Sequence, residues 1–365
     1  MSGNSSSTST KPTIDNAKLD SFKNKIFENL GGTYVTLLCA IGDRLKLFKD
    51  LATNGPATSQ ELAQRANINE RYAREWLSAL TCAGYLEFDS KNSRFILPPE
   101  HSPALANEGG PMFIAGAYQE LFALVKNLNQ LVDIFQKGGG IAIEEYDENK
   151  FAGTERLTAT WFENYLIQQW IPAIPDVQTK LEKDALVVDI GCGRGRALIK
   201  LAQTYANSRF VGYDVFGQAI SNANANAISA RVADRVKFRQ LDVVVDGLPE
   251  KYDIITTFDV VHDMINTRGA LRAISHALQP NGTCLMLEIN CKDKLKDNIG
   301  PLGAFFYSMS VLYCMTTSLA GGGEGLGTAG LPESKVREFC KEAGFRKVHR
   351  VPIENPFNVL YEIKP

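Results

Sequence analysis

The sequence predicts an α/β protein: a doubly wound sheet that ends in an antiparallel hairpin, preceded by a mostly helical N-terminal region. From residue 184 onward, five short β-rich runs alternate with helical stretches, as in a parallel sheet covered by helices. Two further runs, joined by the tight turn ENPF, predict a terminal antiparallel hairpin. Before residue 106, apolar residues recur at helical spacing. The seven runs are ALVVDI, RFVGYDV, VKFRQLDV, YDIITTFDVV, TCLMLEI, RKVHRVPI and NVLYEIKP.

Composition limits the class of protein. A length of 365 residues is sufficient for more than one domain. The formal net charge of −2 gives no positive excess of the kind that binds nucleic acid or an anionic membrane. The seven cysteines are odd in number and include no CxxC pair. They predict reduced thiols in a cytoplasmic protein and no metal centre.

Two segments could be mistaken for a secretory signal or a membrane-spanning helix. The start, MSGNSSSTSTKPT, lacks the apolar core of a secretory signal, so we expect a flexible tail over residues 1–18. Residues 301–320 carry no charge over 20 positions, which is the length of a membrane-spanning helix. Ser and Thr interrupt this run, which lies between predicted strands of one sheet. We therefore expect a buried lid or pocket helix and no membrane insertion.

Residues 19–105 have the element order of a winged helix. Apolar side chains recur at helical spacing over residues 20–53, and the sequence NGP then breaks the pattern. Thr58 and Glu61 form a capping-box pattern, and Asn69 is placed to cap the next helix. The runs YLEF and RFIL then flank the polar turn DSKNS, which predicts the hairpin of the wing.

The charges of this module argue against DNA binding. Residues 55–97 hold five cationic and five acidic side chains, so their net charge is zero. Binding to a phosphate backbone needs a positive excess. The module is therefore expected to pack against another protein surface, although a DNA-binding sensor stays open as the alternative. The ten residues are Arg65, Arg71, Arg74, Lys91, Arg94, Glu61, Glu70, Glu75, Glu87 and Asp89.

Residues 106–180 predict a helical connector that caps a pocket. Glycines 138–140 and the prolines at 172 and 175 break the helical pattern. The aromatic side chains of this segment fit either a core or the roof of a pocket, and the sequence leaves both open. We expect Glu144, Glu145 and Tyr146 to reach that pocket.

A glycine-rich turn follows the first strand of the predicted sheet. In VVDIGCGRGR, residues 187–196, Asp189 precedes Gly191, Gly193 and Gly195. Such a turn brings the backbone close to a small ligand. A phosphate-binding P-loop is excluded, because no Gly-Lys-Ser/Thr follows. A dinucleotide fingerprint is disfavoured because Arg196 occupies the place of its last glycine.

Acidic residues end the next strands. Asp214 closes the second strand, 23 positions after Gly191, where a carboxylate can accept both hydroxyls of a ribose. Asp242, followed by Val243, ends the third strand, where it could receive the amino group of adenine. Phe258 and Asp259 end the fourth strand, where the other end of the ligand would lie. For Asp214 and Asp242, an ordinary strand-end turn is the alternative.

Together these motifs resemble a class I S-adenosylmethionine-dependent methyltransferase. VVDIGCGRG, QLDV, FDVVHD and the terminal hairpin carry the resemblance to that fold. VVHDM, ALQPNG and LEIN, with the winged helix, are similar to small-molecule O-methyltransferases that dimerise through such a domain. The resemblance implies a Rossmann-like seven-stranded domain over residues 181–365 with a lid insertion at 291–332. It also implies S-adenosyl-L-methionine as cofactor, a small-molecule acceptor and a homodimer.

A histidine follows the fourth strand, at the sheet edge where ligands bind in open α/β folds. An ordinary histidine side chain titrates near neutral pH, so His262 is of a type suited to remove a proton from a hydroxyl acceptor. In the plant-type enzymes that the chain resembles, the matching histidine is the general base and a glutamate, matched here by Glu288, supports it. Met264 departs from that pattern, which has tryptophan there. A purely positioning role for His262, and N-, S- or C-methylation, therefore stay open.

Overall fold

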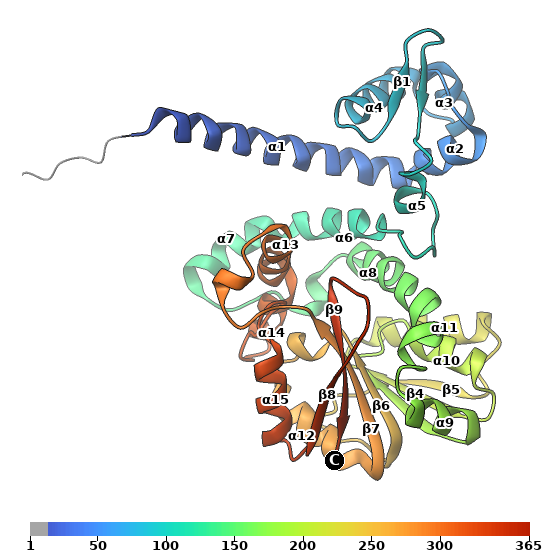
Figure 1. Cartoon of the computed structure of the whole chain (residues 1–365), viewed down its shortest axis with the longest axis vertical. Helices are drawn as coiled ribbons and strands as arrows, with labels where there is room; N and C mark the ends of the chain where they lie inside the picture. The colour runs from blue at the N-terminus through green and yellow to red at the C-terminus, as the bar shows by residue number, and fades with distance from the viewer. Residues whose placement is uncertain (1–13) are drawn as a thin grey trace, which may run out of the picture. The chain divides into compact units, whose positions relative to one another are not determined.

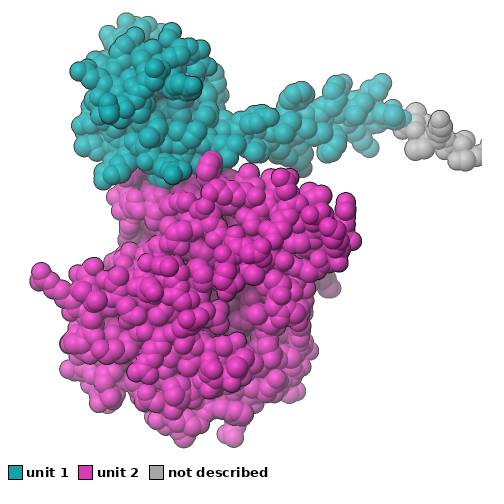
Figure 2. Space-filling view, turned by 180° about the vertical axis from the view of Figure 1, so that it is seen from behind, with its two compact units in different colours: residues 1–102 teal, residues 103–365 magenta. Residues whose placement is uncertain are grey.

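The structure, a computed structural model, describes residues 14–365, so most of the expected tail at 1–18 lies outside the described residues. The chain divides into two compact units: the first ends at Ser102 and the second begins at Pro103 (Figure 2). Each unit is described by itself below.

The first unit has the predicted order of helices followed by a hairpin. The Thr58 hydroxyl accepts a hydrogen bond from the Glu61 amide, and the Glu61 carboxylate accepts one from the Thr58 amide, so the predicted capping box is present. Asn69 caps the next helix as expected. The elements are α1 (Asn16–Arg44), α2 (Leu47–Asn54), α3 (Ser59–Ala66), α4 (Glu70–Cys82), β1 (Glu87–Asp89) and β2 (Arg94–Ile96).

The helical stretch predicted over 20–53 is two helices. The break comes at Lys46, whose φ of 60° is left-handed and cannot continue a helix. Trp76 of α4 organises the core of this unit: its indole N–H donates to the Leu38 carbonyl at 2.9 Å. The ring also packs edge-on against Phe48, with centroids 5.2 Å apart. The buried residues of α1 itself are confined to its C-terminal part, at Cys39 and Gly42.

The second unit contains one seven-stranded sheet (Figure 1). All seven predicted strands are present, which confirms the predicted fold class. The strand order is β5-β4-β3-β6-β7-β9-β8, with β9 antiparallel to both of its neighbours. The strands are β3 (Leu186–Ile190), β4 (Arg209–Asp214), β5 (Val236–Gln240), β6 (Tyr252–Phe258), β7 (Leu278–Ile289), β8 (Lys347–Val351) and β9 (Asn358–Lys364).

Helices connect and cover these strands. The helices that follow β3, β4, β6 and β7 in the chain are α10 (Arg196–Thr204), α11 (Gly217–Ser229), η4 (Val261–Asp263), α12 (Thr267–Ala277) and α15 (Glu333–Glu342). Those that precede the sheet are α5 (Ser102–Leu105), α6 (Gly116–Leu124), η1 (Val125–Asn127), α7 (Leu128–Lys137), η2 (Ile143–Glu145), α8 (Glu148–Trp161), η3 (Phe162–Trp170) and α9 (Pro175–Lys183).

Both faces of the sheet are buried. Because side chains alternate along a strand, Val187 of β3 joins the core formed with η3, α9, α10 and α11. The next residue, Val188, joins the opposite core, formed with α12 and α15. The strand order reverses at β3, which has β4 on one side and β6 on the other. Such a switch point leaves a crevice at the carboxyl ends of the strands, where open α/β sheets bind ligands.

The insertion between β7 and α15 carries the uncharged segment. It comprises η5 (Leu295–Asp297), α13 (Pro301–Met309), η6 (Ser310–Cys314) and α14 (Met315–Ala320). Within the described residues this is the one helical run with the length and apolar composition of a membrane span. It is only partly buried, because Tyr313 is buried while Phe305 is 47% exposed. Hydrogen bonds tie it into the second unit: Thr316 accepts from the Ile141 amide, and the Leu312 carbonyl accepts from Tyr146.

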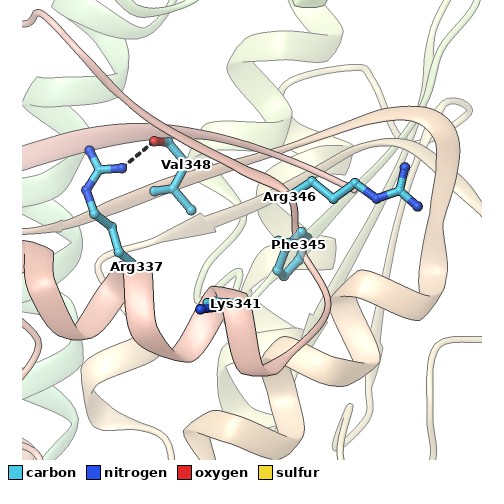
Figure 3. A pocket seen from close by; sticks show the side chains of 5 residues that line it. All are labelled: Arg337, Lys341, Phe345, Arg346 and Val348. Atoms are coloured by element: carbon cyan, nitrogen blue, oxygen red, sulfur yellow. Dashed lines mark hydrogen bonds between the residues drawn. The ribbon is translucent and has the colours of Figure 1, made fainter.

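A shallow depression of about 420 Å³ lies between α15 and β8 (Figure 3). Arg337 crosses it and donates to the Val348 carbonyl at 2.6 Å. The register pairs the start of β8 with the end of β9, beside the amino-terminal part of β7. The depression is therefore at the sheet end opposite the ligand-binding edge. Its lining residues are Arg337, Lys341, Phe345, Arg346 and Val348.

Candidate active site

The glycine-rich turn leaves β3 at the switch point. The amides of Gly191 and Cys192 both donate to the carbonyl of Tyr213 on β4, at 2.8 and 3.1 Å. These bonds continue the pairing of β3 and β4 beyond the end of β3. The turn is therefore fixed by backbone contacts before any side chain acts on it.

The three glycines of the turn all have positive φ, but for different physical reasons. A Cβ at Gly191 would collide with the Val260 side chain, and one at Gly195 would collide with the ring of Phe238. A Cβ at Gly193, where φ is +51°, would meet nothing within 4 Å. Packing therefore requires the outer two glycines, while Gly193 presents bare backbone to open space beside the switch point.

Asp214 holds this turn in place from the end of β4. One carboxylate oxygen accepts from the Gly193 amide at 2.9 Å, and the other accepts from the Phe216 amide at 2.9 Å. Burial raises the pKa of this carboxyl above its ordinary value, while the hydrogen bonds act in the opposite direction. Each oxygen keeps a further lone pair, so a ligand hydroxyl can still bind here. The ribose role stays a prediction.

Asp189 lies inside the sheet. Its carboxylate accepts from the Thr256 hydroxyl of β6 at 2.6 Å, which joins the two central strands below the turn. Burial raises the pKa of Asp189 to about 7, and the Asp214 charge adds to this. The contact orders the end of β3 from which the glycine turn leaves.

Asp242 is occupied by a local turn. Its carboxylate accepts from the Val244 amide at 2.8 Å, and its own amide donates to the Asp246 carboxylate at 2.9 Å. This is the strand-end turn that was the alternative to adenine binding. Val243 is buried in the core of the sheet. The role of Asp242 toward adenine stays a prediction.

The end of β6 is strained and aromatic. Asp259 has a φ of +60°, which is uncommon for a residue with a side chain. Its carboxylate accepts from the Asn358 amide group at 3.0 Å. Phe258 stacks near Phe162 and Trp170, with ring centroids 5.6 and 6.1 Å away. Burial raises the pKa of Asp259 to about 7, with His262 acting against the rise.

His262 and Glu288 form the predicted pair. Nδ1 of His262 lies 2.7 Å from Oε2 of Glu288, and Oε1 of Glu288 accepts from the Val261 amide at 2.8 Å. Both side chains are buried, at 3% and 0% exposure. One carboxylate of β7 thus fixes the ring and the backbone of η4 together. With Nδ1 engaged, Nε2 is the nitrogen that remains available for chemistry.

A second carboxylate faces this nitrogen. Oδ1 of Asp263 lies 3.0 Å from Nε2 of His262. Burial disfavours the imidazolium, but Asp263 and Glu288 raise the pKa of His262 well above its ordinary value. The two carboxylates therefore favour the protonated ring, and the ring becomes a proton acceptor only after it loses that proton.

The remaining wall of the site comes from α8 and η6, which lie in the expected pocket cap and in the expected pocket helix. Nζ of Lys150 lies 3.2 Å from the centre of the Tyr313 ring and 3.8 Å from the Glu120 carboxylate. Tyr313 meets the ring of Tyr146 edge-on, with centroids 5.0 Å apart. Cys314, beside Tyr313, is buried near His262. These contacts join segments far apart in the chain, so no local pattern announces them.

The three residues expected from 144 to 146 behave differently. Tyr146 is buried, and burial raises the pKa of its hydroxyl, with nearby acidic groups including Asp263 adding to the rise. Glu144 and Glu145 are exposed on η2, where Glu145 accepts from the Gln130 amide group at 2.8 Å. The expected approach of these two glutamates to the pocket is therefore not found, because the 3-10 turn directs only Tyr146 inward.

Comparison with known proteins gives one family match for the N-terminal part of the chain and another for the sheet-containing part. Residues 33–107 match the family model of an Rv2258c-like winged HTH domain, and residues 181–313 match that of a methyltransferase domain. Polyketide synthase ThaQ from Burkholderia thailandensis is 30% identical over 112 residues, which cover 29% of this chain. The match spans only 5% of that much longer protein.

Solved structures extend the likeness over almost the whole chain. A putative O-methyltransferase from Nostoc punctiforme PCC 73102 has a TM-score of 0.71 at 19% identity and covers 96% of this chain and 100% of its own. Human N-acetylserotonin methyltransferase, solved in complex with SAM, has a TM-score of 0.71 at 16% identity, covering 97% and 99%. At these identities the likeness is one of fold. The chain therefore combines a region that matches a winged helix-turn-helix domain with a region that matches a methyltransferase domain.

Proposed function

We propose that this chain transfers a methyl group from S-adenosyl-L-methionine to a small organic acceptor, by preference to an oxygen atom. The observation that carries the proposal is the buried His262–Glu288 pair, at the sheet edge that also holds the glycine turn. A carboxylate on Nδ1 orients the imidazole and stabilises its protonated form, as expected of a general base rather than a core histidine. Methylation of nitrogen, sulfur or carbon is the alternative.

The glycine turn fits the cofactor. Bare backbone at Gly193 leaves room for the amino-acid moiety of the ligand, and a Cβ there would occupy that space. Asp214, which accepts from the Gly193 amide, retains lone pairs that can accept hydrogen bonds from ribose hydroxyls. When bound, S-adenosylmethionine supplies a methyl carbon activated by its sulfonium. What remains for the protein is to align the acceptor and to hold its proton.

His262 performs the proton step in this proposal. Its Nε2 takes the proton of the acceptor hydroxyl, and Glu288 at Nδ1 stabilises the imidazolium that results. Asp263 also stabilises that charge and so keeps the ring protonated to higher pH. The rate of methyl transfer to a hydroxyl should therefore rise with pH through the raised pKa of His262.

The raised pKa can be measured without a substrate. The chain has four histidines, so ring signals in NMR spectra can be assigned by single substitutions. We expect His262 to titrate above about 6.5, its ordinary value. Asp263→Asn should lower its midpoint, because loss of the anion destabilises the imidazolium. The exposed His276 should not respond. A His262 midpoint at or below 6.5, or one unmoved by the substitution, would contradict the electrostatic assignment.

Methyl transfer itself is tested with S-adenosylmethionine that carries a labelled methyl group. We expect the wild type to label one compound in a small-metabolite extract, as followed by mass spectrometry. His262→Ala should reduce the labelling rate by about 10²–10⁴-fold, which is the usual contribution of a general base. Equal labelling by both proteins would preserve the methyltransferase and reject the base. No labelling by either, despite cofactor binding, would reject the proposed activity in that extract.

The cofactor site is tested by a matched pair of glycine substitutions. Gly193→Ala places a methyl group in open space, so we expect affinity for S-adenosylhomocysteine, measured by calorimetry, to fall at least about tenfold. The melting temperature should change little beyond the strain of about 1–2 kcal/mol for a left-handed residue. Gly195→Ala should instead lower the melting temperature strongly, because its Cβ collides with Phe238. Wild-type affinity in Gly193→Ala would exclude the turn as the binding site.

We further propose that α1 pairs with a second copy of the chain. Large apolar side chains along this helix are exposed. Single exposed apolar residues are common on protein surfaces, whereas a long run of them marks an interface. The exposed residues are Leu19, Phe22, Ile26, Phe27, Leu30, Tyr34 and Ile41.

Sedimentation velocity tests the homodimer. Ile26 and Leu30 are one helical turn apart and are 43% and 48% exposed. Ile26→Glu combined with Leu30→Glu should convert a wild-type dimer to a monomer, because two charges would be buried in the interface. The control Tyr72→Glu alters an exposed aromatic residue on α4 and should leave the dimer intact. A monomeric wild type at micromolar concentration would reject the dimer.

Use of the winged helix on DNA is disfavoured by its ion pairs. Arg71 and Arg74 on α4 pair with Glu75 and Glu70. Arg94 pairs with Glu61 at 2.5 Å. Cations neutralised in this way release fewer counterions on a phosphate backbone. We propose a protein-facing module, and a cytoplasmic location in keeping with the five free, buried cysteines of the second unit.

A further inference from the structure

Three potential metal ligands from two separate segments converge beside the proposed base. His262 and Asp263 come from η4, and Cys314 comes from η6. Their ligating atoms, an imidazole nitrogen, a carboxylate oxygen and the thiol sulfur, all lie within 4.8 Å of one another. His262 and Cys314 are buried, and Asp263 is partly buried. The sequence predicted no metal centre, because these ligands follow no local spacing motif.

The distances suit a tetrahedral cation of borderline softness. Zinc binds nitrogen, oxygen and sulfur at about 2.0–2.3 Å, so its ligand atoms lie roughly 3.3–3.7 Å apart. Nε2 of His262 and Oδ1 of Asp263 are 3.0 Å apart, and the sulfur is within 4.8 Å. Small side-chain rotations therefore bring all three atoms to bonding distance around one centre.

Two further observations distinguish this cluster from a simple ion pair. Oδ1 of Asp263 is buried and satisfies no hydrogen-bond geometry, so it is an acceptor that lacks a proper donor. Glu288 engages Nδ1 of His262 at 2.7 Å, which is the carboxylate support that metal-bound histidines usually have.

The geometry points to a binding site for one divalent cation such as Zn²⁺, held by Nε2 of His262, the Asp263 carboxylate and the Cys314 thiolate. The Cys314 thiol and the protonated His262 ring each release one proton to solvent as the sulfur and Nε2 bind the cation. Three protein ligands leave a fourth position for water or a ligand atom. Binding does not depend on methyl transfer. Under the proposed function, a cation on Nε2 would occupy the lone pair of the base and so inhibit the enzyme.

Cobalt titration of the full-length, tag-free, metal-free protein under reducing conditions tests the site. We expect one Co²⁺ per chain, with the near-ultraviolet band of a cobalt–thiolate bond, and displacement by Zn²⁺. Cys314→Ser should remove that band. Asp263→Asn, which keeps the size of the side chain, should weaken Zn²⁺ binding by at least about tenfold in competition titrations. Zn²⁺ should raise the melting temperature of the wild type but not of Cys314→Ser.

Two other thiols provide the controls. Cys82 is exposed on α4 and is the thiol most open to adventitious metal, while Cys340 is buried on α15 outside the cluster. Cys82→Ser and Cys340→Ser should keep the cobalt band and the Zn²⁺ affinity. Absence of the band in the wild type, its persistence in Cys314→Ser, or its loss in Cys82→Ser would overturn the proposal. Circular dichroism spectra of each variant separate loss of ligand from loss of fold.

Discussion

The buried carboxylate of Glu288 is the constraint on which the candidate site depends. A carboxylate with no solvent exposure is costly unless its oxygens are bonded, and here one oxygen takes the Val261 amide and the other takes His262. Because Glu288 belongs to β7 and its partners follow β6, these bonds fix the loop after β6 onto the neighbouring strand. The positive φ of Asp259, just before that loop, is tolerated because the surroundings hold it.

The sheet topology brings this fixed loop to the glycine turn. β3 lies between β4 and β6, so the turn after β3 and η4 after β6 leave the same edge of the sheet. Asp214 and Asp189 stabilise the first of these segments through backbone and Thr256 contacts, and Glu288 stabilises the second. A cofactor on the turn and an acceptor at His262 would then be aligned by rigid strand ends rather than by mobile loops.

The sequence was sufficient for the fold and for part of the site. All seven strands were predictable because each is a short β-rich run bounded by turns or helices, and the His262–Glu288 pair followed from the resemblance to O-methyltransferases. The helix break at Lys46 was not predictable, because a residue other than glycine in the left-handed conformation cannot be recognised from composition. Lys150 over Tyr313 and Cys314 beside His262 were also missed, because only the tertiary fold brings those segments together.

The charge balance around His262 links the proposed reaction to the proposed cation site. Asp263 and Glu288 are close enough to His262 to favour its protonated form, and Asp259 adds a third buried carboxyl. This acidic pocket favours any positive charge that enters it: a proton on the ring, the sulfonium of a bound cofactor, or a divalent metal ion. A cationic cofactor placed nearby would lower the pKa of His262 and so release its proton when the acceptor is to be deprotonated. A metal ion would use the same field to displace that proton, and the two cations would therefore compete.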